Sequence, residues 1–214
     1  MVFHLCNLFR LSISSSIIQE VKELQDAGLA LMAYFYCDFR DSRKQDVRYL
    51  VASLLAQLSA KFHPTHNILS ELYSKCDNGL LQPDDRKLSE YLEKILKKEG
   101  QPPIYIIVDA VDECPSVSGV VSLRDRVLDL VERLVALQLP NLRICLTSRP
   151  EADIRASLGS LASHTVSLHD QSGQQSDIAD YVSFVVHSDR KMRRWRAEDK
   201  NQVIETLSRK ADGM

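Results

Sequence analysis

The chain has 214 residues, of which 44% are hydrophobic and 26% are charged, and this is the composition of an ordinary globular protein. Its formal net charge of -2 gives no overall field that would recruit nucleic acid or an anionic membrane surface. No apolar stretch approaches the roughly 20 residues that a membrane-spanning helix needs. We therefore expect no specific nucleic-acid partner and no membrane association.

The first 13 residues are apolar without a clear period, so a strand is possible there. A signal peptide is disfavoured, because a basic start is missing and His4, Asn7 and Arg10 interrupt the apolar stretch. The five cysteines are odd in number and include no C-x-x-C pair. We expect buried free thiols in a reducing, cytoplasmic compartment, with neither a disulfide framework nor a cysteine metal site.

Residues 14–16 are serines that offer an N-cap for a first helix, and Gly28 closes that helix. Residues 29–39 are rich in aromatic side chains and predict a buried strand. Apolar side chains at helical spacing then predict three helices, which begin near Gln45, His66 and Pro83.

An apolar run at residues 104–108 leads into Asp109, Asp112 and Glu113. The run predicts a strand buried on both faces, and ligands of open α/β sheets bind beyond the carboxyl ends of such strands. One interpretation is a Walker B strand, with Asp109 oriented to Mg²⁺ and Asp112 or Glu113 positioning the attacking water. The other is a strand followed by an acidic helix start.

After a loop at residues 115–121, a helix is expected around residues 127–137 and a third buried strand at residues 142–147. The remaining expected elements are a short helix at 151–158, an edge strand at 165–168 and two polar helices at 174–187 and 198–211. Strands that alternate with helices predict an α/β fold with a doubly wound, mainly parallel sheet flanked by helices.

Three charged stretches each allow a functional and a simpler interpretation. Arg149, which follows the third buried strand, can reach a γ-phosphate, or can simply pair with Asp109 or Asp112. Residues 38–41 are more simply a solvated turn than part of a nucleotide site. The basic run at residues 190–196, with Trp195, can bind phosphates, but a linker between helices is favoured because no other basic surface is evident.

Residues 109–113 and 147–150 resemble the NACHT family, which belongs to the STAND class of P-loop NTPases. Residues 33–41, 167–170 and 193–196 are similar to the fungal set whose NACHT module resembles the nephrocystin-3 N-terminal region. The resemblance extends over residues 14–214. It implies a P-loop NTPase-like fold, with a partial nucleotide-binding domain at 14–170 and the start of a truncated helical domain at 171–214. Residues 1–13 then form an atypical segment that replaces the first strand and the P-loop.

The resemblance implies a switch that binds Mg-ATP or Mg-GTP and acts through protein partners or self-association. By position, Asp109 would serve the Mg²⁺, and Asp112 and Glu113 would polarise water. Arg149 would be the residue called sensor 1, and Ser148 beside it would also face the nucleotide.

The sequence departs from this family at the P-loop, which needs the pattern G-x-x-x-x-G-K-[ST] to cradle phosphate. No glycine precedes Gly28 and no lysine precedes Lys22, which leaves only Ser14, Ser15 or Ser16 as candidate hydroxyl ligands. We therefore expect weak or no nucleotide binding, no useful hydrolysis, and a degenerate or fragmentary module acting in regulation or protein interaction without a cofactor. The alternative is a functional ATP- or GTP-hydrolysing switch whose Walker A segment is missing from this sequence.

Overall fold

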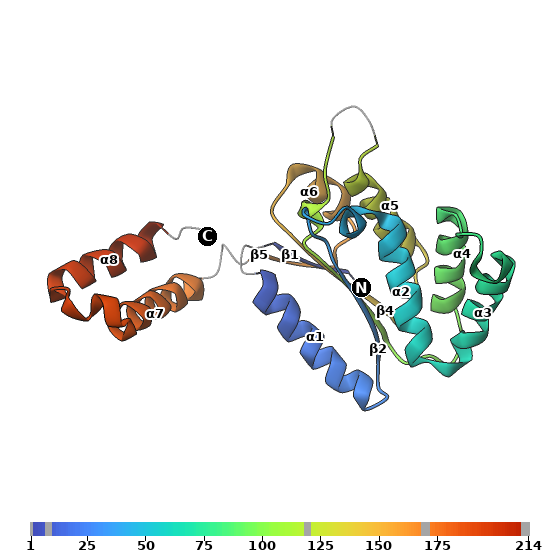
Figure 1. The fold of residues 1–214 in the computed structure, drawn as a ribbon, viewed down its shortest axis with the longest axis horizontal. Helices are drawn as coiled ribbons and strands as arrows, with labels where there is room; N and C mark the ends of the chain where they lie inside the picture. The colour runs from blue at the N-terminus through green and yellow to red at the C-terminus, as the bar shows by residue number, and fades with distance from the viewer. Residues whose placement is uncertain (1, 7–9, 118–120, 168–171, 211–214) are drawn as a thin grey trace.

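The computed structural model describes residues 2–6, 10–117, 121–167 and 172–210. Its centre is a five-stranded sheet with the strand order β2-β3-β4-β1-β5 (Figure 1). The strands are β1 (Val2–Cys6), β2 (Leu31–Tyr36), β3 (Ile104–Asp109), β4 (Leu142–Ser148) and β5 (His164–Ser167). All four pairings are parallel, which confirms the predicted α/β fold with a parallel sheet.

Strand β3 lies between β2 and β4, and its apolar side chains are buried on both faces as predicted. Ile104, Ile106 and Val108 face the larger core, whereas Ile107 faces a smaller one. The register aligns Asp109 with Tyr36 of β2, and aligns Val108 with Leu146 of β4. The parallel strands therefore deliver their last residues to one edge of the sheet.

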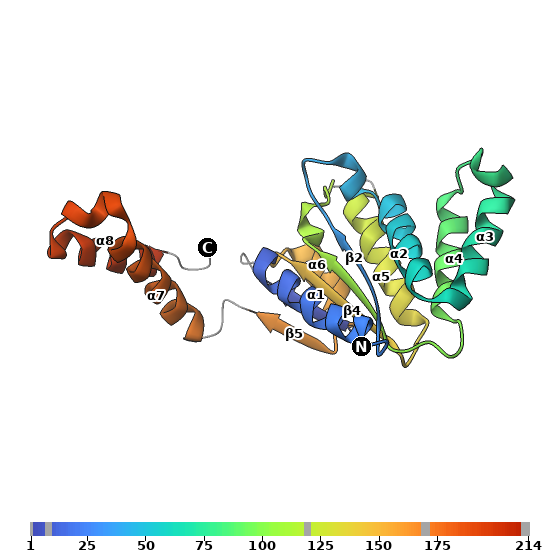
Figure 2. The ribbon, with the colours of Figure 1, turned by 60° about the horizontal axis from the view of Figure 1, so that its bottom comes forward.

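Helices cover both faces of this sheet (Figure 2). They are α1 (Arg10–Asp26), α2 (Val47–Lys61), α3 (His66–Lys75), α4 (Asp85–Leu96), α5 (Leu123–Ala136) and α6 (Ala152–Leu158). Helix α1 packs on one face, where Val21 meets Met32 and Ile107. Apolar side chains of the other five helices share the larger core on the opposite face.

Helix α1 begins at Arg10, so the expectation of an N-cap at residues 14–16 was wrong. Ser14 is fully buried inside the helix, and its hydroxyl donates a hydrogen bond to the Asp109 carboxylate instead of capping the helix end. The predicted end is confirmed: Gly28 has a φ of 74°, and the N–H of the next residue, Leu29, bonds to the carbonyl oxygen of Leu24 at 2.9 Å.

Strand β1 pairs with both β4 and β5, so the place between these two strands in the sheet is filled by a strand. The possible strand within residues 1–13 is thereby confirmed for Val2–Cys6.

Strand β2 is shorter than predicted and lies at an edge of the sheet instead of inside it. Its first three residues are buried, but Tyr34 is 37% exposed. The aromatic residues that suggested a buried strand therefore partly face solvent.

Strand β5 forms the other edge, as predicted, although Leu168 lies outside the described residues. Helices α7 (Ser172–Ser188) and α8 (Ala197–Lys210) pack against each other beyond it (Figure 1). Most of the basic run forms a short 3-10 helix, η6 (Arg190–Arg194), which joins them and which Asp189 caps through the N–H of Lys191 at 2.8 Å. This is the linker that the sequence favoured. The domain division at residues 170 and 171 falls outside the described residues and stays a prediction.

We find no helix with the length and apolar character needed to cross a membrane in the part of the chain that the structure describes.

Candidate functional site

Asp109 ends strand β3 and is only 3% exposed. Its Oδ1 accepts hydrogen bonds from the hydroxyl of Ser14 in α1 and from that of Thr147 in β4, the latter at 2.5 Å. Hydroxyl donors stabilise a buried carboxylate that water cannot reach. Asp109, the predicted Mg²⁺ ligand, is thus held in place by helix α1 and strand β4.

The chain turns sharply after Asp109. Ala110 adopts the left-handed conformation with φ 61° and ψ 45°, which costs a non-glycine residue roughly 1–2 kcal/mol. The turn is secured because the Ala110 N–H donates to Thr147 Oγ1 at 2.9 Å. It leads into the short 3-10 helix η4 (Val111–Glu113), which carries the other two acidic residues away from the sheet.

Asp112 pairs with Arg149, the arginine that the sequence placed at the end of β4. The Asp112 carboxylate accepts from the Arg149 backbone N–H at 3.0 Å and lies 3.6 Å from the Arg149 Nε. The Asp112 side chain is only 5% exposed, whereas that of Arg149 is 56% exposed. Of the two interpretations of Arg149, this geometry matches the pairing with Asp112.

Glu113 contacts the segment that follows β2. Its Oε2 accepts from the Phe39 backbone N–H at 3.1 Å. The neighbouring acids at residues 38 and 41 pair within their own exposed turn, Asp38 with Arg40 and Asp41 with Arg43. These hydrogen bonds lower the pKa of both aspartates. Phe39 and Arg40 form a turn and are exposed, which matches the solvated turn that the sequence favoured.

Ser148 is fully buried at the end of β4, and its Oγ donates to the carbonyl oxygen of Arg149 at 2.8 Å. It does not line the cavity described below. Its predicted contact with a nucleotide stays a prediction.

Arg124, which the sequence did not single out, connects helices α5 and α6 to the segment at residues 109–114, called here the acidic turn. It is 8% exposed, and its guanidinium donates to the carbonyl oxygens of Cys114 at 3.0 Å and Asp112 at 2.7 Å. It also pairs with Asp153 of α6, at 2.9 Å from Nη1 to Oδ2. Burial raises the pKa of Asp153, but the hydrogen bond from Arg124 and a backbone N–H outweigh it, so the pKa is lowered overall.

One signal for Arg124 was present in the sequence. The residue lies in the first turn of α5, where the helix dipole disfavours a cation. An arginine there needs an acceptor elsewhere, and the carbonyls of the acidic turn supply it.

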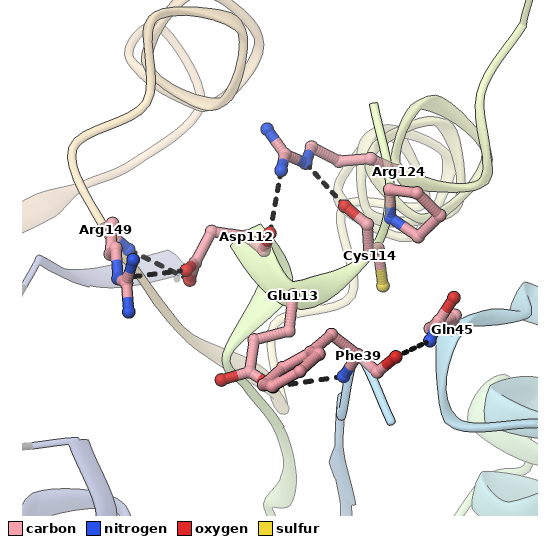
Figure 3. Close-up of a pocket in the computed structure, with 8 residues that line it drawn as sticks. Phe39, Gln45, Asp112, Glu113, Cys114, Arg124 and Arg149 are labelled. Carbon is pink, nitrogen blue, oxygen red and sulfur yellow. Dashed lines mark hydrogen bonds and ion pairs between the residues drawn. The ribbon is translucent and has the colours of Figure 1, made fainter. Parts of the chain in front are cut away.

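A cavity of about 380 Å³ opens beside the acidic turn (Figure 3). Its lining joins two carboxylates and two guanidiniums with an exposed aromatic ring: Phe39, Gln45, Asp112, Glu113, Cys114, Pro115, Arg124 and Arg149. The structure thus brings Asp112, Glu113 and Arg149 together, whereas Asp109 and Ser148 lie outside the lining.

The residues fit a cation better than they fit a nucleotide. Carboxylate and hydroxyl oxygens are ligands that Mg²⁺ prefers, and Ser14 Oγ and Asp109 Oδ1 lie together. A triphosphate also needs a cradle of backbone N–H groups before the helix. Residues 10–13 are coiled into α1 and include neither glycine nor lysine, so this part of the chain does not fit the phosphates. Within the described ranges, no group of three or more His, Cys, Asp or Glu side chains is arranged to hold a metal ion.

The fold and the site define an α/β protein with a parallel sheet and an acidic turn at its carboxyl edge. The nephrocystin 3, N-terminal family matches residues 12–149, which is more than half of the chain, and the chain belongs to this family. The match ends at Arg149, so the resemblance predicted for the rest of the chain stays a prediction.

A comparison with curated proteins found no match. Among solved structures, the chain is similar to one titled "Structure of Drosophila ORC bound to AT-rich DNA and Cdc6", with 11% identity and a TM-score of 0.26. That similarity covers 95% of this chain and 76% of the other. At this TM-score it supports no inference about fold or function.

Proposed function

We propose that the chain is a NACHT-type module of the STAND P-loop NTPase class with a degenerate nucleotide site. It acts in regulation through protein partners or self-association, in the cytoplasm, without hydrolysing ATP or GTP. Membership of the nephrocystin 3 N-terminal family supports the relationship. The acidic turn after β3 supports a Walker B origin.

The start of helix α1 at Arg10 is the observation that supports the proposed loss of nucleotide binding. In a P-loop, the glycine-rich segment ends where the lysine and hydroxyl residue open the helix. If Ser14 is that hydroxyl residue, as its bond to Asp109 suggests, the second glycine and the lysine would be Ser12 and Ile13. Both already lie inside α1, where helical backbone replaces the phosphate cradle.

The three acidic side chains also have protein partners. Asp109 accepts from two hydroxyls, Asp112 from the Arg149 N–H, and Glu113 from the Phe39 N–H. Nucleotide binding would have to exchange these hydrogen bonds, without a lysine to offset the charge of the phosphates. Catalysis of phosphoryl transfer depends on positioning and electrostatics, so we expect no useful turnover.

The second candidate is a working ATP or GTP switch whose Walker A segment this sequence lacks. The contact between Ser14 and Asp109 favours it, because a P-loop hydroxyl and a Walker B aspartate share the same Mg²⁺. Mass spectrometry of the N-terminal peptide of the cellular protein separates the two candidates. Detection of residues 1–13 as given supports the degenerate module, and a different N-terminal segment with a G-x-x-x-x-G-K-[ST] motif supports the switch.

Binding of a fluorescent ATP analogue to the purified chain, with and without Mg²⁺, tests the proposal directly. We expect no saturable binding by a folded, monodisperse protein. The matched variant is Asp109→Asn, which keeps the side-chain shape and removes the charge. Saturable Mg²⁺-dependent binding that weakens in Asp109→Asn would contradict the degenerate module.

A further inference from the structure

Two histidines lie side by side on the turn that joins helix α2 to helix α3. His63 opens the 3-10 helix η2 (His63–Thr65), and His66 follows this helix and begins α3. Both side chains are exposed, and the centres of their rings are 5.0 Å apart with 38° between the ring planes. Imidazole nitrogen is the commonest metal ligand in proteins, so two rings this close are a candidate metal site.

The 3-10 geometry of the turn explains why the two rings meet. A 3-10 helix has about three residues per turn, so side chains three positions apart stand one above the other. Pro64, which lies between the histidines, favours this turn because its ring fixes φ and its missing N–H would have no partner at the start of a helix. The sequence His63-Pro64-Thr65-His66 therefore aligns two imidazoles on the outside of the turn.

The other side of the turn is anchored to the protein. Thr65 is fully buried, and its N–H and its hydroxyl both donate to the carbonyl oxygen of Phe62, at 2.9 Å and 2.6 Å. The Phe62 side chain packs against the larger core, and the His66 N–H donates to the carbonyl oxygen of His63. The backbone of both histidines is thus held before an ion arrives, which reduces the entropy lost on binding.

The separation of the rings suits a tetrahedral ion. Zn²⁺ binds a histidine nitrogen at about 2.0–2.1 Å, which places the ion about 3 Å from the centre of the ring. Two rings bound at a tetrahedral angle then have centres about 5 Å apart. The 5.0 Å between the rings of His63 and His66 matches this value.

We propose that His63 and His66 bind one Zn²⁺ ion, each through a ring nitrogen. Imidazole favours Zn²⁺ over Mg²⁺, which prefers oxygen ligands. Within the described residues, no group of three or more His, Cys, Asp or Glu side chains is arranged to hold a metal ion, so water completes the coordination. The site is therefore an open one, in which another donor group can replace a bound water.

The proposed zinc site is separate from the acidic turn. Helix α2 follows β2 at the carboxyl edge of the sheet and runs back to Lys61. Lys61 and Phe62 line a second cavity, of about 580 Å³, together with Gly100, which precedes β3. The histidines therefore lie near the amino edge of the sheet, and their affinity for Zn²⁺ does not depend on the state of the nucleotide site.

The test is isothermal titration calorimetry of zinc chloride into the purified, reduced chain. We expect one ion per chain, and we expect His63→Asn and His66→Asn each to weaken binding at least about tenfold, because loss of a ligand should cost no less than loss of an outer-shell partner. Both positions are exposed, so the variants should keep the fold, which circular dichroism checks. His187→Asn is the matched control, since it removes an exposed histidine of α7 and should leave the affinity unchanged.

Nuclear magnetic resonance of the ring nitrogens identifies the ligands directly, and the signals of His63 and His66 should move together as Zn²⁺ is added. The proposal is overturned if the chain binds no Zn²⁺, or if both variants bind it as tightly as the wild type does. A loss of affinity in only one of the two variants would also overturn it, because the site requires both rings. An equal loss in His187→Asn would place the ion elsewhere on the chain.

Discussion

At the scale of single residues, Thr147 secures the acidic site from the neighbouring strand. Its hydroxyl accepts from the strained Ala110 at 2.9 Å and donates to Asp109 at 2.5 Å, and it is 2% exposed. One hydroxyl group thus satisfies a buried N–H and a buried carboxylate. The identity of this residue matters because no water can substitute for it without extra space.

We predict that Thr147→Val lowers the free energy of unfolding by about 1–3 kcal/mol, because a buried donor and acceptor lose their partner while the volume stays the same. Thr147→Ser, which keeps the hydroxyl and loses one methyl group, should cost only about 1 kcal/mol. Urea denaturation of both variants measures the difference. Equal losses would show that the hydroxyl does not stabilise the turn.

Arg124 acts on the other side of the turn. We predict that Arg124→Met lowers the free energy of unfolding by about 2–4 kcal/mol, since two carbonyl oxygens and the Asp153 carboxylate lose a buried donor. Arg126→Met is the control, because Arg126 is exposed on the same helix and its replacement should change stability by no more than about 0.5 kcal/mol. Similar effects of the two substitutions would contradict a tie between Arg124 and the turn.

The pair of Arg124 and Asp153 also predicts a pH dependence. The pKa of Asp153 is lowered in the folded chain, so its contribution to stability is present above the unfolded value of about 3.9 and is lost as pH falls through the folded pKa. The advantage of the wild type over Asp153→Asn should be at most about 1 kcal/mol near pH 6, because this carboxylate is 34% exposed. It should shrink below about pH 4. Denaturation across this range checks the sign, and an advantage that grows on acidification would contradict the assignment.

Part of this site was predictable at the residue scale. The acidic cluster after an apolar run placed Asp109 correctly at the carboxyl end of β3, because the signal is local. The partners of Asp109 come from α1 and β4, which are distant in sequence. No local pattern of residues reveals which hydroxyl will meet which carboxylate, so Ser14 was only one of three candidates and Thr147 was not singled out.

At the scale of elements, the edge strand β2 has its outer backbone groups covered by a side chain. The Gln57 carboxamide of α2 accepts from the Tyr34 N–H at 3.1 Å and donates to the Tyr34 carbonyl oxygen at 2.8 Å. These are the two groups that an added strand would engage. Gln57 therefore blocks the pairing of β2 with another chain at this position.

We predict that Gln57→Ala promotes concentration-dependent self-association, because it uncovers both groups of Tyr34 on the edge strand. Light scattering coupled to size-exclusion chromatography measures the mass. Lys61→Ala, an exposed position one turn further along α2, is the control and should stay at the mass of the wild type. A mass of Gln57→Ala that does not rise with concentration would show that Gln57 does not protect the edge.

The helices and strands themselves were largely predictable, because apolar side chains recur at a local period. The start of α1 was missed because three serines resemble a cap, whereas the buried Asp109 takes the hydroxyl of Ser14 for itself. The edge position of β2 was missed because aromatic residues are equally typical of buried strands and of half-exposed ones. In both cases a contact made only in the folded chain decides the outcome.

At the scale of the whole molecule, the sequence predicted a parallel α/β sheet but could not give the strand order. In this order, β1 lies between β4 and β5, although β1 comes from the first residues of the chain and the other two strands come more than 130 residues later. This pairing positions the start of α1 against the carboxyl edge, where a phosphate loop would lie in a P-loop NTPase. On the function proposed above, this arrangement would keep the frame of a nucleotide site while helix α1 takes the place of the phosphate cradle.

The measurement that tests this account most directly is Mg-ATP binding, by isothermal titration calorimetry, to the wild type and to a triple variant with Asn7→Gly, Ser12→Gly and Ile13→Lys. Together with Ser14, these changes restore the pattern G-x-x-x-x-G-K-[ST]. The last residue of the restored pattern is Ser14, whose hydroxyl bonds to Asp109. We predict that the wild type does not bind and that the triple variant gains binding, which Asp109→Asn in the same background removes. Mg-ATP binding by the wild type with an affinity equal to that of the triple variant would contradict the central claim that the missing cradle abolishes the nucleotide site.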